Sequence, residues 1–153
     1  MDTPLPNIVG PQPVLLSTVI CEDDARSNRD GSLSLQRVFY VLKPQTLPVR
    51  QDFVVVGLWW LRGAGQCVIS TRIRDVDGGV LDELSSDMRY DSHAIHEQSS
   101  RFVGVEFTTA GTYRIEVLLD GDVAGAYPLF VEPPLITPVP ASVNEPVVQA
   151  PVG

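Results

Sequence analysis

Apolar positions in the middle of the chain alternate with polar ones, or run together over short lengths, in segments that turn residues separate. None of these segments has the apolar spacing of an amphipathic helix of ten or more residues. We therefore predict strands at Val14–Ile20, Leu33–Leu42, Phe53–Leu61, Cys67–Arg74, Val80–Leu84, Arg101–Phe107, Thr112–Leu119 and Val123–Val131. Short strands at nearly regular spacing predict an all-β fold, an antiparallel β-sandwich of about seven or eight strands.

Turn residues mark the reversals of the chain between these strands. Asn28-Arg29-Asp30-Gly31 joins the first two strands, and Gly63-Ala64-Gly65 separates the third from the fourth. Asp75-Val76-Asp77-Gly78-Gly79 reverses the chain again, because glycine adopts a positive φ at no steric cost. The segment from Ser85 to Ser100 is polar, with weak helix signals, and we expect it to form a long loop or one irregular turn.

The last two strands form the best-defined unit of the pattern. Gly111-Thr112-Tyr113 leads into an alternating strand with Ile115 and Val117 on the same face as the tyrosine, and Asp120-Gly121 closes a hairpin. The penultimate strand of an immunoglobulin-like sandwich often begins this way, with the tyrosine ring packed inward and its hydroxyl bonded to the preceding corner. We therefore predict an immunoglobulin-like sandwich with a tyrosine corner at Tyr113.

Two adjacent tryptophans, Trp59 and Trp60, fall in the third predicted strand. Because successive side chains of a strand point to opposite faces, one tryptophan should anchor the core. The other should lie exposed to solvent or be covered by another surface.

Prolines concentrate at both ends of the chain. Residues 1–13 hold four prolines, and residues 133–153 hold six more, interleaved with valines and few charges. Proline cannot donate to a strand ladder, so the second stretch is either a disordered linker or an extended strap that orders on a partner. We therefore predict an extended N-terminal arm at 1–13, one β-sandwich domain at 14–132 and a proline-rich tail at 133–153.

The chain is acidic, with 11 basic and 19 acidic residues, a formal charge of −8 and a pI near 4.5. Its arginines are scattered along the sequence, so direct binding of nucleic acid is not expected. No apolar stretch of 18 or more residues is present, and the N-terminus lacks the charged and apolar regions of a signal peptide. We therefore expect a cytoplasmic protein without a membrane span.

Cys21 and Cys67 are the only cysteines. Both lie in apolar strand patterns, where a reduced, buried thiol is the common state. An antibody-type disulfide would place its second cysteine two residues after Tyr113, but that position is Ile115. We therefore predict that both cysteines are free.

His93 and His96, flanked by Asp91 and Glu97, come nearest to a metal site. Histidines three apart can share one face of a helix, and a carboxylate could complete a zinc or iron set. The segment lacks a helical pattern, however, and no third nitrogen or thiolate lies nearby in sequence. A polar loop explains these residues better, and we predict no metal and no cofactor.

The sequence Asp75-Val76-Asp77-Gly78 resembles the start of a calcium loop, and carboxylates at 22–24 and 120–122 would add further oxygen ligands. The glutamate that closes an EF-hand is missing, because the twelfth position is Ser86. Asp-Gly pairs are also ordinary in hairpins. A turn therefore explains these aspartates better than calcium does.

Sequence motifs for nucleophilic catalysis are missing as well. The chain has neither a Gly-x-Ser-x-Gly elbow nor a glycine-rich phosphate loop. Both histidines fall in one segment, so a Ser/His/Asp set would have to be built around Ser92 or Ser99. We therefore predict that the protein is not an enzyme.

An apolar strand followed by Cys21-Glu22-Asp23-Asp24, and then the stretch from Arg29 to Phe39, resembles the opening of a bacterial family of uncharacterised small single-domain proteins. Its members open with an acidic turn of the form "cadd" or "ada" and a strand of the form "nGklsllGvf". They close with "F…GxYxfxlxldGxxlxxxPlxV", which Thr108 to Val131 follows closely. The resemblance covers about Leu15 to Val131 and implies an immunoglobulin-like sandwich with no established activity. Gln36-Arg37 departs from it, since the pattern has a small or apolar pair there.

These observations favour a non-catalytic protein-interaction or assembly module that acts through a sandwich face or edge and through the extended arms. The interaction surface would include Trp59 or Trp60, whichever is exposed, and the apolar arm residues Pro138, Val139 and Pro140. The partner would be another protein or further copies of this chain. One alternative is a sandwich that binds a small ligand or carbohydrate by stacking on the exposed tryptophan. Another is a structural component of a virion or secretion apparatus, by fold analogy alone.

Overall fold

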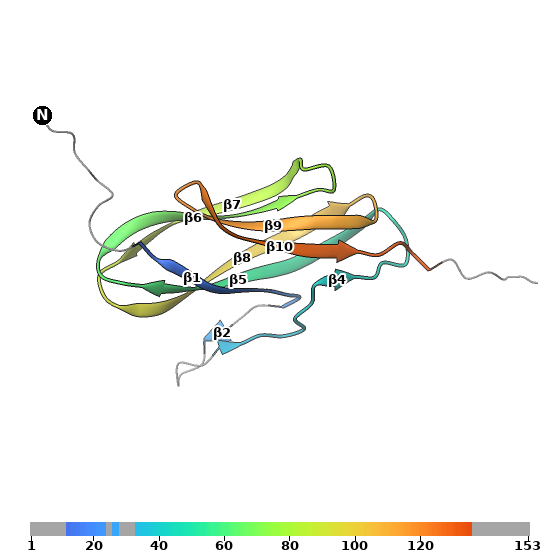
Figure 1. Cartoon of the computed structure of the whole chain (residues 1–153). Coiled ribbons are helices and arrows are strands. Elements are labelled where there is room, and N and C mark those ends of the chain that lie inside the picture. The colour runs from blue at the N-terminus through green and yellow to red at the C-terminus, as the bar shows by residue number, and fades with distance from the viewer. Residues whose placement is uncertain (1–11, 24–25, 28–32, 136–153) are drawn as a thin grey trace, which may run out of the picture.

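The computed structural model describes residues 12–23, 26–27 and 33–135, and every regular element within these residues is a β-strand (Figure 1). The strands are β1 (Val14–Cys21), β2 (Arg26–Ser27), β3 (Leu33–Ser34), β4 (Val41–Leu42), β5 (Val49–Leu61), β6 (Gly65–Arg74), β7 (Val80–Tyr90), β8 (Ala94–Phe107), β9 (Gly111–Leu119) and β10 (Asp122–Val131). The predicted proline-rich arms lie almost wholly outside the described residues, as does the predicted turn at 28–31.

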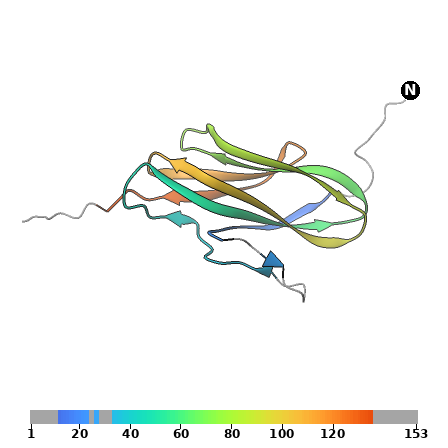
Figure 2. The ribbon, with the colours of Figure 1, turned by 180° about the vertical axis from the view of Figure 1, so that it is seen from behind.

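Two sheets pack face to face (Figures 1 and 2). One has three strands in the order β1-β5-β8, and the other has five in the order β4-β10-β9-β6-β7. Paired neighbours are antiparallel, except that the short β4 runs parallel to the end of β10. The strands β2 and β3 pair only with each other. The predicted all-β sandwich is therefore confirmed.

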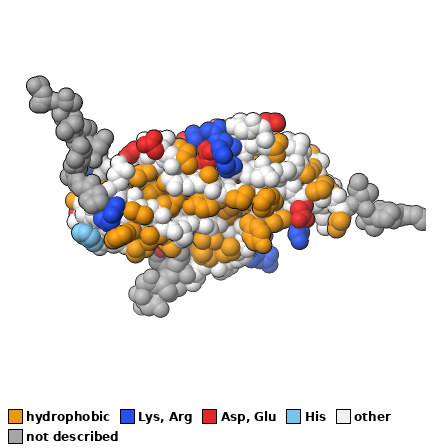
Figure 3. Space-filling view, viewed as in Figure 1, with side chains coloured by type: hydrophobic (Ala, Val, Ile, Leu, Met, Phe, Trp, Pro, Cys, Tyr) orange, Lys and Arg blue, Asp and Glu red, His pale blue; other side chains and the backbone are white. Residues whose placement is uncertain are grey.

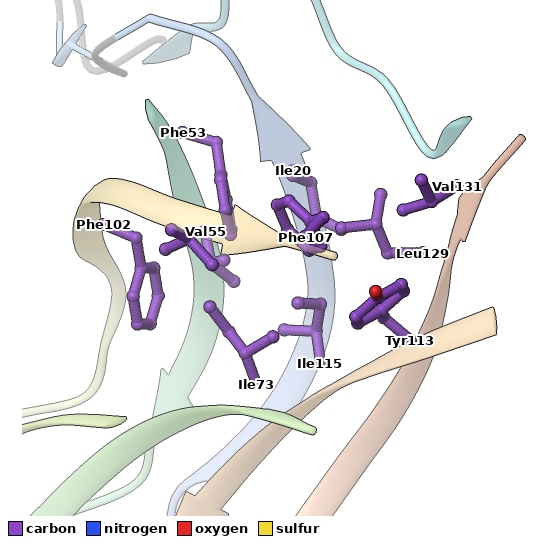
Figure 4. Close-up of a cluster of buried hydrophobic side chains, with 11 residues drawn as sticks. Ile20, Phe53, Val55, Ile73, Phe102, Phe107, Tyr113, Ile115, Leu129 and Val131 are labelled. Carbon is purple, nitrogen blue, oxygen red and sulfur yellow. The ribbon is translucent and has the colours of Figure 1, made fainter. Parts of the chain in front are cut away.

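Side chains from the inner faces of the two sheets fill the core in two main clusters. The first gathers aromatic rings: Phe53 stacks on Phe102 with 5.3 Å between ring centroids, and Phe107 meets Tyr113 edge to face at 4.9 Å (Figure 4). The second is built around Trp59, which is fully buried. Alternation along each strand therefore places large apolar side chains of both sheets in one shared interior.

A polar pair links the two sheets inside this core. Thr71 lies on β6 between Ile73 of the first cluster and Ile69 of the second, and its hydroxyl oxygen is 3.0 Å from that of Ser100 on β8. Both residues are buried, so each hydroxyl satisfies the other where water has no access.

Tyr113 fixes the corner between β8 and β9. Its hydroxyl donates to the carbonyl oxygen of Thr109 at 2.7 Å and accepts from the Thr109 N–H at 3.3 Å, while its ring is buried in the first cluster. A tyrosine that bonds backbone four residues upstream near the start of a strand is the predicted tyrosine corner, which is confirmed.

The strand predicted at Leu33–Leu42 is wrong. The structure divides this stretch between β3, which pairs with β2, and β4, which pairs with β10 of the five-stranded sheet. Arg37 lies between them with φ at 58°, a left-handed conformation that interrupts an extended strand. The chain turns there because it passes from one side of the sandwich to the edge of the other sheet.

The loop predicted at 85–100 is also wrong. β7 continues to Tyr90 and β8 begins at Ala94, so only Asp91, Ser92 and His93 connect them. Both strands pair on one side only. β7 is largely exposed and the residues of β8 before Ser100 are exposed or half-buried, which lets polar side chains occupy them. The two strands also meet through a 2.9 Å hydrogen bond from Gln98 Nε2 to Ser86 Oγ.

Candidate functional site

The outward side of β5 is apolar from Val54 to Trp60. Residues 53, 55 and 59 point into the core, so strand alternation turns Val54, Val56, Leu58 and Trp60 outward. The outward face of an antiparallel sheet is ordinarily polar, because water contacts it. The outward side of β5 must therefore be covered by another part of the chain or serve as a contact surface.

A segment of the chain covers the first half. The described residues between Glu22 and Tyr40 (22–23, 26–27 and 33–40) are here named the cover segment. They lie on the side of the three-stranded sheet that faces away from the other sheet (Figures 1 and 2). Its Leu35 packs against Cys21, Val54 and Val56, which are each at most 1% exposed. A backbone hydrogen bond from Phe39 N to Ile20 O attaches the segment to β1, and one from Glu22 N to Arg37 O links two parts of the segment itself.

The second half is open to solvent. Trp60 is 42% exposed, and its cross-strand neighbours are Val14 on β1 and Ile95 on β8, the latter 60% exposed. These three residues, here named the Trp60 row, form an apolar line across all three strands of the sheet. Leu58 lies half-buried beside it, between the row and the covered half.

Arg62 holds the exposed indole in place. Its guanidinium carbon lies 5.1 Å from the centre of the Trp60 ring, and its Nη2 donates to the carbonyl oxygen of Gln12 at 2.9 Å. A cation over an exposed aromatic ring contributes about 0.5–1 kcal/mol. The same side chain therefore fixes both Trp60 and the start of β1.

Only one of the predicted site residues, Trp60, lies at a surface of the described structure. Trp59 is the core anchor and Trp60 is the exposed partner, as strand alternation predicts, so only Trp60 lies at a surface. Pro138, Val139 and Pro140 lie outside the described residues. Sequence reasoning missed Ile95, because it falls in the stretch expected to be a loop. The apolar run from Phe53 to Leu61 was the available signal, since it makes both faces of that strand apolar.

The candidate metal ligands do not form a cluster. His93 lies exposed in the β7–β8 turn, and His96 lies on β8 opposite Trp59. Within the described part of the chain, no group of three or more His, Cys, Asp or Glu side chains could hold a metal ion. The Asp75 carboxylate instead accepts from the backbone N–H groups of Asp77 and Gly79, which makes it a turn residue.

Both cysteines are free and buried, as predicted. Burial, and to a smaller extent the charge of Asp120, raises the pKa of the Cys67 thiol to about 11. Burial also raises the pKa of Cys21, with the charge of Asp23 adding to the shift. These thiols stay protonated at neutral pH, and a protonated thiol is a poor nucleophile.

A model of a family of unknown function, DUF6941, matches residues 16–132. The chain belongs to this family. The part that matches DUF6941 takes in the cover segment and most of both sheets, and it agrees closely with the range of the resemblance noted from the sequence. No curated protein matches the chain. Nowhere in the described residues is there a helix long and apolar enough to cross a membrane.

Proposed function

We propose that this member of DUF6941 is a non-catalytic protein-interaction module that binds a partner protein through the Trp60 row. One observation carries the proposal: the outward side of β5 is apolar at four alternate positions, and the cover segment buries only the first two. Exposed aromatic and aliphatic side chains gathered on a rigid sheet are the composition of an interface core.

The face at Trp60 is favoured as the contact over the sheet edges at β10 and β1. Along β10, Pro128 has no N–H to offer, and the strand register shifts between Val123 and Gly125. Along β1, the register shifts between Leu15 and Ser17. Prolines and bulges at edges oppose the addition of another strand. The exposed face at Trp60 has no such obstacle.

We further infer that the sandwich is of the immunoglobulin type. The supporting features are the penultimate strand β9 lying between β10 and β6, the parallel pairing of an early strand with the last one, and the tyrosine corner at Tyr113. Fold type alone implies no function. The free thiols and the family resemblance favour a bacterial cytoplasmic location, where thiols stay reduced.

The test compares two exposed aliphatic residues of the same strand. Ile95 is 60% exposed within the Trp60 row, and Val103 is 68% exposed elsewhere on β8. The full chain is immobilised and the proteins captured from its own host are quantified by mass spectrometry. We expect I95T and W60T to lose a partner that the wild type and V103T retain. A set of captured proteins that is the same for all four would contradict the proposal.

A small-ligand site is the second candidate, and the exposed indole of Trp60 beneath Arg62 is the observation in its favour. Its flanking residues Val14 and Ile95 are apolar and offer no acceptors for sugar hydroxyls, which favours a protein surface. A glycan array separates the two candidates: a saccharide that binds the wild type but not W60T would support the ligand site.

A further inference from the structure

Three arginines surround one carboxylate on the outward face of the five-stranded sheet. Glu116 on β9 accepts from Arg72 Nη2 at 2.7 Å, from Arg74 Nε at 2.9 Å and from Arg114 Nη2 at 2.8 Å, and it is only 3% exposed. Although burial acts to raise its pKa, the hydrogen bonds from Arg72 and Arg74 outweigh it, and the pKa of Glu116 lies below its ordinary value. The glutamate is therefore ionised beneath the guanidinium groups.

The charges of this cluster do not balance. Glu83 contributes a second carboxylate, 4.0 Å from Arg72 Nη1, so three cations meet two anions. Arg74 and Arg114 are directly opposed across β6 and β9, and like charges in that position are destabilising. The chain as a whole carries a charge of −8, whereas the three arginines of this cluster outnumber its two glutamates. Like charges held together at a cost in stability are typical of a functional surface.

An apolar groove borders the arginines. It has a volume of about 590 Å³, and its lining includes Val41, Thr112 and Phe130, with Phe130 41% exposed, together with one acidic residue, Glu132. Cross-strand pairing places Pro128 beside Arg114 and Phe130 beside Thr112, so the groove and the arginine pair occupy adjacent positions of β9 and β10. Figure 3 shows basic side chains, with acidic atoms among them, next to a hydrophobic band.

We propose that this face binds an acidic segment of a partner protein. A carboxylate of the segment pairs with Arg74 and Arg114, which supplies the missing negative charge, and an apolar side chain next to it enters the groove at Phe130. Arginine suits this role because its planar guanidinium binds a carboxylate in a bidentate manner. Arg114 is the accessible member, since its side chain is 57% exposed while its Nη2 holds Glu116.

This surface is independent of the Trp60 row, because the two lie on the outward faces of different sheets. A module with both surfaces holds two partners at once, one apolar and one acidic. Variants of the Trp60 row should therefore leave the acidic segment bound, and variants of the arginine cluster should leave the other partner bound.

The test selects peptides from a random twelve-residue library displayed on phage, with the full chain as bait. We expect enriched peptides to carry Asp or Glu within a few residues of a large apolar side chain. Fluorescence anisotropy with the best synthetic peptide should then show about a tenfold loss of affinity for R114Q and for R74Q. F130T should weaken the same peptide without changing the charge. Sodium chloride should also weaken it, because exposed charges are screened.

R89Q is the matched control, because Arg89 is an exposed arginine toward the far end of β7 and its replacement removes the same charge. Equal affinity of R89Q and R114Q for the peptide would overturn the proposal, as would enrichment of peptides that lack acidic residues. If R74Q does not fold, R114Q and F130T still decide the question, and unchanged binding by both would overturn it.

Discussion

Trp59 and Trp60 are consecutive residues of β5, and their indole rings lie in opposite environments: Trp59 is fully buried between the sheets, whereas Trp60 is 42% exposed on the outward face. Strand alternation alone separates them by the full thickness of the sheet. Trp59 therefore stabilises the fold, whereas Trp60 is free to contact a partner. Substitutions at the two positions should have different consequences, the first for folding and the second for binding.

Replacing Tyr113 with phenylalanine should lower the free energy of unfolding by about 1–2 kcal/mol. The change removes the hydroxyl that donates to Thr109 O at 2.7 Å and leaves a part-buried carbonyl without its partner. Chemical denaturation measures the effect. Y40F serves as the control, because Tyr40 is 67% exposed and its hydroxyl contacts water. Equal stabilities for the two variants would show that the hydroxyl of Tyr113 does not stabilise the corner.

Replacing Arg37 with glycine should stabilise the protein by about 1 kcal/mol, because a side chain in the left-handed region is strained and glycine is not. Arg37 has φ at 58°, and its salt bridge to Glu22 is exposed and 3.5 Å long. R37A is the control: it removes the same salt bridge but keeps the strain, so it should give no gain. A glycine variant that is no more stable than R37A would show that the backbone there is unstrained.

Replacing Glu116 with glutamine should destabilise the protein at neutral pH by about 2 kcal/mol, because three arginines lose their shared counter-charge. Since the pKa of Glu116 is lowered on folding, its contribution is present above the ordinary value of 4.5 and is lost as the pH falls through the lowered pKa. The difference between wild type and E116Q should therefore shrink in acid. E106Q, which breaks the exposed pair with Arg50, should change stability little at any pH.

Alkaline pH should weaken the fold through Cys67. The pKa of an unperturbed thiol is 9.0, whereas that of Cys67 in the folded protein is about 11. Between these two pH values the unfolded chain therefore loses a proton that the folded chain keeps. Stability should therefore fall as the pH rises from 9 to 11, and C67A should show a shallower fall than the wild type. Parallel melting-temperature profiles for the two proteins would contradict the raised pKa.

The local pattern of apolar, polar and turn residues was enough to predict the final hairpin and the tyrosine corner. Tyr113, Thr109 and the Asp120-Gly121 turn lie close together in sequence, and their conformations follow from residue type and strand alternation. Asp120 and Gly121 have φ values of 49° and 88°, as a tight hairpin turn requires. The strand from Phe53 to Leu61 was equally clear, because apolar residues fill both of its faces.

Features that depend on distant segments were not predictable in the same way. The break at Arg37 separates β3, which pairs with β2, from β4, which pairs with β10 of the five-stranded sheet. The arginines around Glu116 come from β6 and β9, some 40 residues apart, so only the strand register brings them together. Ile95 was missed because polar residues of an exposed edge strand resemble those of a loop.

Photo-crosslinking in the host cell shows whether a partner protein contacts the Trp60 row. A benzophenone amino acid is placed at position 95, within the Trp60 row, or at position 103, which is slightly more exposed on the same strand. We expect a covalent adduct with another protein from position 95 and none from position 103. An adduct from position 103 alone, or none from position 95 in cells that contain the folded protein, would contradict the assignment of the Trp60 row as the contact surface.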